Sequence, residues 1–410
     1  MATDSGDDAL PIPAVTTETQ EWVPTDDGRY SRAELSRQRG PYQSAIPAPI
    51  SDWAPSLSSS LSADVEDATR ALVDFDSYAV RVLGADDPAI GPMSAILLRT
   101  ESASSSQIEN LTTSARQLAL AELDETDKPN AVEVVGNVRA MEAALRLSER
   151  IDASAILAMH AELLSRAPGM QQHAGAWRDQ LVWIGRDNAG PRGAEFVAPQ
   201  PNRIAELVRD IVDFTAREDL PVVVQVAVSH AQFETIHPFV DGNGRAGRAL
   251  AQALLRNKGL ASHTTVPVSA GLLTDTTSYF AALTAFRSGD AAHIVRRFAD
   301  AARYAAVTGR RLVDGLAAQL ADAHDRLAGV RPQAAAWRVV PHLVGQPVVN
   351  TAYLVEHLGL NKTTATRTLG LLTDRGILTE GTGRRRNRVW QHEGVLDVLD
   401  DYAESIRRGR

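Results

Sequence analysis

Hydrophobic positions along most of this chain recur with the three-to-four-residue spacing of an α-helix. The pattern begins at Ser62, where the stretch VEDATRALVDFDSYA places apolar residues at i, i+3 and i+4. The same spacing predicts further helices at about 89–98, 105–124, 130–148, 153–165, 201–215, 220–236, 243–257, 274–286 and 290–328. We therefore expect a mainly α-helical fold.

Two segments of the body depart from this helical period. Residues 1–60 are rich in Ser, Thr, Asp and Pro and show no regular apolar spacing, which predicts an extended or partly disordered arm. The stretches WRDQLVWIG (177–185) and AEFVAP (194–199) predict two short strands around the Gly-rich segment RDNAGPRG. We interpret this second segment as a β-hairpin.

The helical body ends at VRPQ (330–333), which has the composition of a linker. After it, the stretch 351–391 predicts a helix, a turn, a second helix and two strands, the order of a winged helix-turn-helix. The expected domains are the arm (1–60), an N-terminal helical region (61–170), a core (171–330) and a small winged domain (334–410).

Charge is distributed unevenly along the chain. The whole chain of 410 residues carries a net charge of −9, yet from Arg331 onward 12 Lys or Arg residues face 8 Asp or Glu residues, a net charge of +4. The acidic balance therefore belongs to the body, so the molecule as a whole is not a nonspecific nucleic-acid binder. Basic side chains are expected on the outer face of the second helix and in the hairpin of the winged domain, and these candidates for DNA contact are Lys362, Arg367, Arg384, Arg385, Arg386 and Arg388. The alternative is a module for protein docking or dimerisation, and the sequence leaves both open.

Cysteine is absent, which excludes disulfides, Cys-ligated zinc and thiol nucleophiles. The N-terminal stretch MATDSGDDALPIP lacks the basic start and apolar run of a signal peptide, and no apolar stretch approaches the roughly 20 residues of a membrane span. We expect a cytoplasmic protein with no membrane partner.

The stretch ETIHPFVDGNGRAGRAL (234–250) concentrates chemically active residues in a turn between two predicted helices. A helix that starts near Asn243 directs unpaired N–H groups and the positive end of its dipole at a bound anion. Arg245 and Arg248 lie about one turn apart, and arginine binds phosphate oxygens bidentately. Asp241 offers an oxygen ligand for Mg²⁺, and His237 can act as a general base near neutral pH. A base, a metal ligand and an anion cradle are the parts that phosphoryl-type transfer requires.

Each of these residues alone has an ordinary structural explanation, such as a helix-end histidine or a turn aspartate. The complete run favours a single ligand instead. Glu234 and His237 also form a Glu-x-x-His pair, as in di-iron bundles, but such sites need a second pair and the chain has no other.

The segment HPFVDGNGRAGR (237–248) resembles the signature of Fic-domain proteins, H-x-F-x-[DE]-G-N-G-R-x-x-R, at every defined position. The stretch 175–201 is similar to the substrate-positioning flap of that family, and 278–290 to the helix that follows its core. The resemblance spans roughly 60–330. It implies a helical Fic core with a β-hairpin flap, and transfer of AMP from ATP to a Ser, Thr or Tyr hydroxyl of a target protein, with release of pyrophosphate.

The resemblance also implies roles for individual residues. His237 would be the general base, and Asp241 would bind Mg²⁺. Phe239 would anchor the turn, whereas the nucleotide would lie against Gly242, Asn243, Gly244, Arg245 and Arg248. The presence of both glycines favours adenylyl transfer over the kinase activity of some relatives, although ATP is not distinguished from other nucleotides.

A second motif lies upstream. SSSQIENL (104–111) contains Ser105-x-x-x-Glu109-Asn110, which resembles the inhibitory [ST]-x-x-x-E-[GN] helix of the family, here expected at about 104–112. Ser105 and Glu109 are one turn apart and are expected to share a face. In such relatives the glutamate pairs with the second arginine of the signature, here Arg248, and some relatives also use it to remove AMP.

Three functions remain open from the sequence. The leading hypothesis is an autoinhibited, Mg²⁺-dependent protein adenylyltransferase, which could modify itself or act as a homodimer. The alternatives are a DNA-binding regulator with a nucleotide-sensing core, and a hydrolase that removes AMP from proteins.

Overall fold

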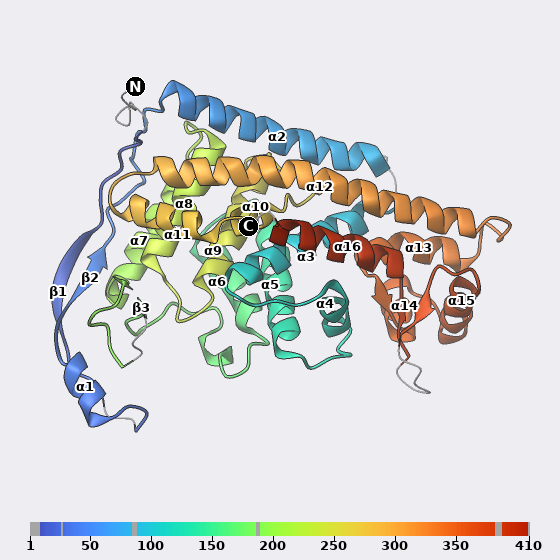
Figure 1. Cartoon of the computed structure of the whole chain (residues 1–410), viewed down its shortest axis with the longest axis horizontal. Helices are drawn as coiled ribbons and strands as arrows, with labels where there is room; N and C mark the ends of the chain where they lie inside the picture. Colours follow the sequence, from blue (N-terminus) through green and yellow to red (C-terminus); the bar gives the residue numbers. More distant parts are fainter. Residues whose placement is uncertain (1–8, 26–27, 84–87, 186–188, 382–387, 409–410) are drawn as a thin grey trace. The chain divides into compact units, whose positions relative to one another are not determined.

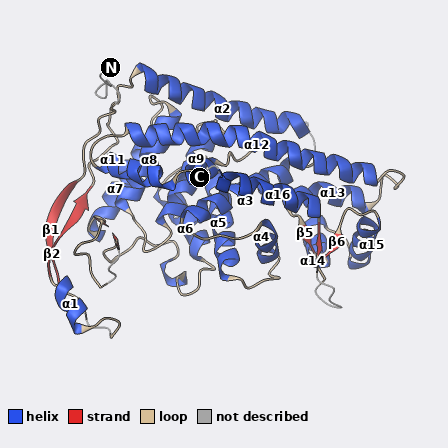
Figure 2. Ribbon diagram, viewed as in Figure 1, coloured by secondary structure: helices blue, strands red, loops and turns tan. Residues whose placement is uncertain are grey.

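The computed structural model describes residues 9–25, 28–83, 88–185, 189–381 and 388–408 of the chain. Helices dominate the described backbone, as the hydrophobic spacing predicts (Figures 1 and 2). The helices are α1 (Arg32–Gln38), α2 (Ser59–Leu83), α3 (Ile90–Ile108), α4 (Ala115–Glu122), α5 (Pro129–Arg146), α6 (Ala153–Leu164), α7 (Ile204–Thr215), α8 (Val222–Ile236), α9 (Asn243–Asn257), α10 (Val268–Leu273), α11 (Thr276–Arg287), α12 (Ala292–Arg326), α13 (Ala335–Gly345), α14 (Thr351–Leu358), α15 (Lys362–Asp374) and α16 (Glu393–Arg408). The strands are β1 (Thr16–Trp22), β2 (Gly40–Ile46), β3 (Trp183–Ile184), β4 (Phe196–Val197), β5 (Val348–Val349), β6 (Thr379–Glu380) and β7 (Trp390–Gln391).

The chain divides into two compact units, neither of which is continuous in sequence. Unit 1 comprises Met1–Asp67, Ala143–Asn257 and Thr277–Ala299. Unit 2 comprises Ala68–Glu142, Lys258–Thr276 and Asp300–Arg410.

Helix α8 forms the centre of unit 1. From Val223 to Ile236 its residues are buried, including polar ones, so it lacks the single apolar stripe of a surface helix. Helices α7 and α9 pack directly against it, and α6 packs against α9. Gly247 of α9 lets the two central helices approach closely, because a Cβ there would lie 3.0 Å from the Phe233 ring of α8.

The N-terminal arm contains regular structure that its composition does not predict. Strands β1 and β2 form an antiparallel hairpin whose register pairs Thr16 with Ile46 and Trp22 with Gly40. Helix α1 lies between them and begins with a capping box, in which Ser31 and Glu34 satisfy each other's backbone N–H groups. The hairpin depends on partners elsewhere in unit 1, which explains why the local sequence gives so little sign of it.

Helix α3 is continuous over the region where the sequence pattern predicts a break between 98 and 105. The Ser-rich run appears too polar for a buried helix, yet Glu101, Ser102 and Ser104–Ser106 are all buried. Ser102 donates to the carbonyl of Leu98, and Glu101 accepts from the backbone N–H and the hydroxyl of Ser269 at 2.8 and 2.6 Å. Side-chain hydrogen bonds thus allow this polar helix to be buried against α10.

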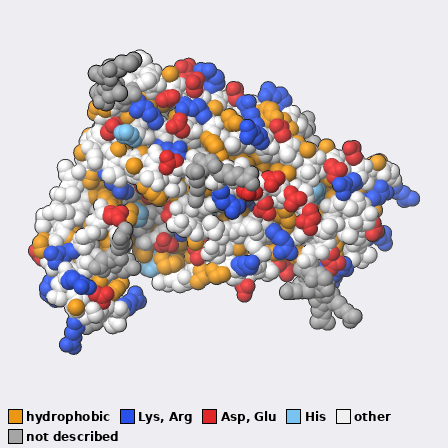
Figure 3. Space-filling view, in the orientation of Figure 1, with side chains coloured by type: hydrophobic (Ala, Val, Ile, Leu, Met, Phe, Trp, Pro, Cys, Tyr) orange, Lys and Arg blue, Asp and Glu red, His pale blue; other side chains and the backbone are white. Residues whose placement is uncertain are grey.

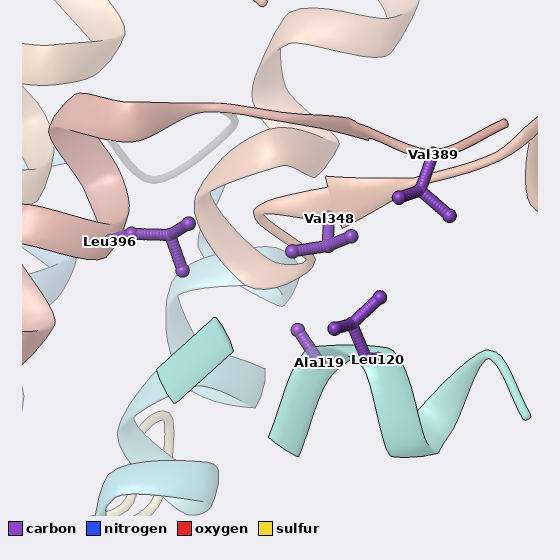
Figure 4. Close-up of a cluster of buried hydrophobic side chains, with 5 residues drawn as sticks. All are labelled: Ala119, Leu120, Val348, Val389 and Leu396. Carbon is purple, nitrogen blue, oxygen red and sulfur yellow. The ribbon is translucent and has the colours of Figure 1, made fainter. Parts of the chain in front are cut away.

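The last part of unit 2 has the helix and strand order predicted for a winged domain. Helices α14 and α15 pack together, and Gly359 ends α14 in the left-handed conformation with φ of 63°. The strand order of the sheet is β5-β7-β6. Figure 4 shows Ala119 and Leu120 of α4 facing Val348, Val389 and Leu396, which makes this sheet and α16 part of the same hydrophobic core as α4.

Candidate active site

The turn between α8 and α9 is fixed by its own side chains. His237 ends α8 in the left-handed region at φ 51° and ψ 59°, and its N–H still donates to the carbonyl of Phe233. Asn243, the first residue of α9, uses both ends of its amide on Phe239: its Oδ1 accepts from the backbone N–H at 2.8 Å, and its Nδ2 donates to the carbonyl at 2.9 Å. The family resemblance implies that this amide holds a phosphate; in the structure it closes the turn.

The His237 ring is oriented by the end of α8. Its Nδ1 lies 3.3 Å from the carbonyl oxygen of Glu234 and 4.0 Å from Oε2 of the same residue. Because a carbonyl oxygen can only accept, Nδ1 carries the proton and Nε2 is the basic nitrogen. The side chain is 21% exposed, which leaves it accessible to a substrate hydroxyl.

The charged residues that follow His237 differ in exposure. The Asp241 side chain is 53% exposed and lies 3.4 Å from a terminal nitrogen of Arg245, which is itself only 6% exposed. Arg248 is buried. The first turns of α9 therefore carry two buried arginines, one of which lies beside the accessible carboxylate of Asp241.

Gly242 allows the chain to enter α9 tightly. Its φ is 77°, and a Cβ there would come within 2.7 Å of the Leu163 side chain. A side chain at this position would thus be strained twice, by conformation and by contact. Gly244 follows inside the first turn of α9 and is partly exposed.

Arg178 is a buried residue of this site that sequence reasoning missed. Its side chain and backbone donate to the carbonyls of His237 and Pro238 at the turn. The same guanidinium donates to Gln180 at 2.9 Å and to Pro199 at 2.7 Å, on the two sides of the predicted hairpin. Burial lowers the pKa of Arg178 to about 10, so the group stays protonated at neutral pH. The available signal was a cation at the start of the predicted strand WRDQLVWIG (177–185).

His160 of α6 is a second missed residue. Its ring stacks on Phe239 with centroids 3.6 Å apart and planes 4° apart. Nδ1 accepts from the N–H of Gly175, so Nε2 carries the proton and donates to the carbonyl of Asp241 at 3.0 Å. Burial lowers the pKa of His160 to about 4, which keeps the ring neutral. The ring thereby supports both the turn and the residue that would bind a metal.

Phe239 is fully buried between His160 and Trp177, whose ring stacks on it at 5.0 Å. This environment is that of a hydrophobic anchor. His230 lies on α8, about two turns before His237. Its ring is 2.7 Å from the hydroxyl of Tyr279. Burial and the charge of the nearby Arg248 lower the pKa of His230 to about 3.

The hairpin predicted over 177–199 forms as β3 and β4, which are two residues each and pair Trp183 with Val197. Ile184 is 41% exposed, an unusual degree for its type. The N-terminal hairpin supports this flap, since Trp22 contacts Trp183 edge-on at 5.5 Å. Gln200, at the end of the flap, also donates to the Tyr42 hydroxyl at 3.0 Å.

The upstream motif lies at the end of α3. Ser105 is in the last turn of that helix and is fully buried. Glu109 caps the helix and is exposed, and Asn110 has a left-handed φ of 62°. The helix expected at about 104–112 therefore ends at Ile108, and Ser105 and Glu109 differ in exposure instead of sharing one face.

The candidates for DNA contact have different environments. Lys362 and Arg367 are exposed on α15, while Ala365, Thr368 and Leu369 of the same helix are buried. Arg388 pairs with Glu380 and lies over the Trp390 ring at 4.8 Å, so its charge is already balanced. Arg384, Arg385 and Arg386 lie outside the described residues.

Two protein-family models match segments of this chain. The model of the Fic/DOC family matches residues 150–255, which include α6, the flap, α8, the turn and most of α9. This chain carries a Fic domain. The model of the Fic/DOC family N-terminal region matches residues 62–146, from α2 to the end of α5.

Relatives with Fic domains carry names that state an activity. A probable protein adenylyltransferase of Aquifex aeolicus is 31% identical over 167 residues, which are 40% of this chain and 49% of that protein. The protein adenylyltransferase fic-1 of Caenorhabditis elegans is 30% identical over 139 residues, 31% of this chain and 24% of that protein. The chain thus spans half or less of these relatives. A Fic family protein from Desulfovibrio desulfuricans superposes with a TM-score of 0.44 at 23% identity, over 78% of this chain and 95% of that one.

Across the part of the chain that the structure describes, no helix is both long and apolar enough to cross a bilayer.

Proposed function

We propose that this Fic domain transfers AMP from ATP to a hydroxyl group of a protein. The observation that carries this proposal is the His237 ring, whose Nδ1 faces a carbonyl, together with Arg245 and Arg248, which are buried on the first turns of the helix that follows. A base next to an anion cradle suits attack of a hydroxyl on a phosphate.

In the proposed reaction, Nε2 of His237 removes the proton of a Ser, Thr or Tyr hydroxyl. The hydroxyl oxygen forms a bond to the α-phosphorus, the bond between the α-phosphorus and the bridging oxygen breaks, and pyrophosphate leaves. Arg245 and Arg248 balance the charge that develops on the leaving group, and their burial strengthens this interaction. Asn243 keeps the turn in shape instead of moving during the reaction.

The site suits a Mg²⁺ ion that would be bound mainly by the phosphate oxygens of the nucleotide. Asp241 offers one accessible carboxylate, and among the described residues no three His, Asp or Glu side chains group together as a metal site. Mg²⁺ commonly binds one or two carboxylates, phosphate oxygens and water, so Asp241 alone is a sufficient protein ligand. When bound, the ion would shield phosphate charge. We therefore expect chelation by EDTA to abolish transfer.

The flap is proposed to position the target. Its strands are short, and the side chain of Ile184 is exposed beside them. An extended peptide could add to this hairpin through backbone hydrogen bonds, which would place its hydroxyl near His237.

Pyrophosphate release tests the proposal together with nucleotide incorporation. Wild type, His237→Ala and the control His357→Ala would be compared, the control being an exposed histidine of α14. We expect release and incorporation in equal amounts for wild type and the control, and a loss of at least about a hundredfold for His237→Ala. Pyrophosphate release without incorporation would favour a hydrolase that turns over ATP, or AMP-modified protein formed from it, without net labelling.

We further propose that Glu109 restrains this activity, as its motif suggests. The variant Glu109→Gly should raise the transfer rate, whereas Glu133→Gly on α5 serves as a control for loss of a carboxylate. Equal rates in wild type and Glu109→Gly would contradict the restraint. The same assay with AMP-modified protein as substrate would show whether Glu109 also supports removal of AMP.

DNA binding by the winged part of unit 2 is a second candidate, which the exposed Lys362 and Arg367 of α15 favour. Acidic side chains gather over α16 in the space-filling view, so a DNA surface would have to exclude that helix (Figure 3). Salt-dependent binding to duplex DNA, weakened by Lys362→Glu and Arg367→Glu, is the expected result. Binding that these variants leave unchanged would assign α15 to protein docking or dimerisation.

A further inference from the structure

Unit 2 contains a cavity of about 360 Å³ that the adenylyl-transfer site does not use. This volume is within the roughly 300–1,000 Å³ of pockets that bind small molecules. One wall is a single face of α3, on which Ile96, Thr100, Ala103 and Gln107 follow at helical spacing. Helix α16 also lines the cavity.

The inner surface of the cavity combines apolar and polar side chains. Ile96 and Leu118 contribute from α3 and α4, and Leu399 and Ile406 from α16, and all four are buried. Ser104 and Gln107 add a hydroxyl and an amide to this surface. A ligand that fits it has an apolar body and one polar group that forms hydrogen bonds.

The buried charge beside the cavity is balanced within the protein. Arg99 donates to both carboxylate oxygens of Glu122 at 2.7 and 2.8 Å, and it also donates to the carbonyl of Gly345. The other two charges of the lining, Asp400 and Arg407 of α16, are exposed and have opposite signs. An ionic ligand would lose hydration without gaining a buried counter-charge, so the surface favours an uncharged one.

The cavity also borders the turn that carries Glu109. Its wall includes Gln107 just before the turn and Thr112–Ala115 just after it. The carbonyl of Gln107 accepts from the N–H of Asn110 at 3.0 Å, and the carbonyl of Ser106 accepts from Leu111 at 3.0 Å. A molecule that contacts both of these segments would restrict the turn from both sides.

We propose that this cavity is a regulatory binding site for a small uncharged amphipathic molecule, whose presence holds the α3–α4 turn in place. The binding of this molecule and the ordering of the α3–α4 turn do not depend on the catalytic activity. Any effect on AMP transfer rests on the proposed function and on the restraint by Glu109.

Fluorescence titration with N-phenyl-1-naphthylamine, an uncharged aromatic amine, tests the site on the full chain. Wild type should bind it saturably at one site, and Ala103→Phe on α3 should weaken binding at least about tenfold by filling the cavity. Ala403→Phe fills it from α16 and gives the same test if the first variant loses its circular-dichroism signal. The matched control is Ala95→Phe, the same change at a partly exposed position of α3 outside the cavity.

The anionic probe 1-anilinonaphthalene-8-sulfonate should bind more weakly than the uncharged amine. Saturable binding that survives in both filled variants, or no binding to wild type, would overturn the site. Tighter binding of the anionic probe would overturn the assignment of an uncharged ligand.

Hydrogen exchange at Glu109–Leu111 tests the second part of the proposal. The uncharged amine should slow exchange of these amides in wild type and in Ala95→Phe, and leave it unchanged in the filled variants. Unchanged exchange at full occupancy would overturn the coupling to the turn. Because neither readout requires catalysis, failure of the proposed adenylyl transfer would leave both results interpretable.

Discussion

Arg178 connects two parts of the candidate site, the turn at His237 and the flap. Its donors reach the turn at His237 and both sides of the flap, and all of these acceptors are carbonyl oxygens. These hydrogen bonds thus set the distance between His237, the proposed base, and the flap, the surface proposed for the target. The sequence could not reveal this, because the acceptors of the side chain are backbone atoms up to 59 residues away from Arg178.

Replacing Arg178 should therefore affect both stability and catalysis. Arg178→Met would leave buried carbonyls without donors and lower the free energy of unfolding by on the order of 3 kcal/mol. Arg178→Lys keeps the charge but cannot reach all acceptors, so an intermediate loss is expected. Urea unfolding measures both, with the exposed Arg209→Met as control. Equal stability of Arg178→Met and wild type would contradict the claim that these hydrogen bonds stabilise the fold.

His160 predicts a specific pH dependence. Its pKa falls from the ordinary 6.5 to about 4 on folding, so the unfolded chain takes up a proton at a higher pH than the folded one. Stability contributed by the neutral ring is therefore complete above pH 6.5 and is lost as the pH falls toward 4, by roughly 3 kcal/mol.

The variant His160→Gln should flatten this dependence, because glutamine can accept from Gly175 and donate to Asp241 without titrating. His230 also has a lowered pKa, so part of the slope should remain. Chemical unfolding at several pH values between 4 and 7 measures the slopes. Identical slopes for wild type and His160→Gln would show that His160 does not titrate as its burial implies.

At the scale of elements, helix periodicity predicted most of unit 1, including α8 and α9 with the turn between them. The prediction was wrong within α3, where buried Ser and Glu side chains find hydrogen-bond partners that no local pattern displays. The β1–β2 hairpin was missed for a similar reason, since Trp22 and Tyr42 pack on the flap more than 100 residues away. The site residues of the signature were readable because one ligand requires them in a short stretch, whereas Arg178 and His160 depend on tertiary contacts.

The junction between α8 and α9 can be tested through Gly242. Gly242→Ala should cost stability for two reasons, the positive φ and the contact with Leu163. Gly259 has the same φ of 77° but open space around it, so Gly259→Ala measures the conformational part alone. We expect Gly242→Ala to be the more destabilising by about 1 kcal/mol or more in urea unfolding. Equal losses would mean that Leu163 moves aside without cost.

At the scale of the whole molecule, the chain combines a Fic domain with a C-terminal part that has the helix and strand order expected of a winged domain. It also contains a cavity beside the motif that is proposed to restrain transfer. The Fic/DOC family model matches residues 150–255, which include the turn at His237. Glu109 and the cavity belong to unit 2, whereas His237 belongs to unit 1.

The central claim is the transfer of AMP, and the most direct test follows the label of ATP. Glu109→Gly and Glu109→Gly with His237→Ala would each be incubated with Mg²⁺ and ATP labelled at either the α- or the γ-phosphate, alone and with a cell lysate. We predict protein-bound label from the α-phosphate only, and its loss when His237 is replaced. Label from the γ-phosphate would show a kinase instead, and no label from either position would contradict the account.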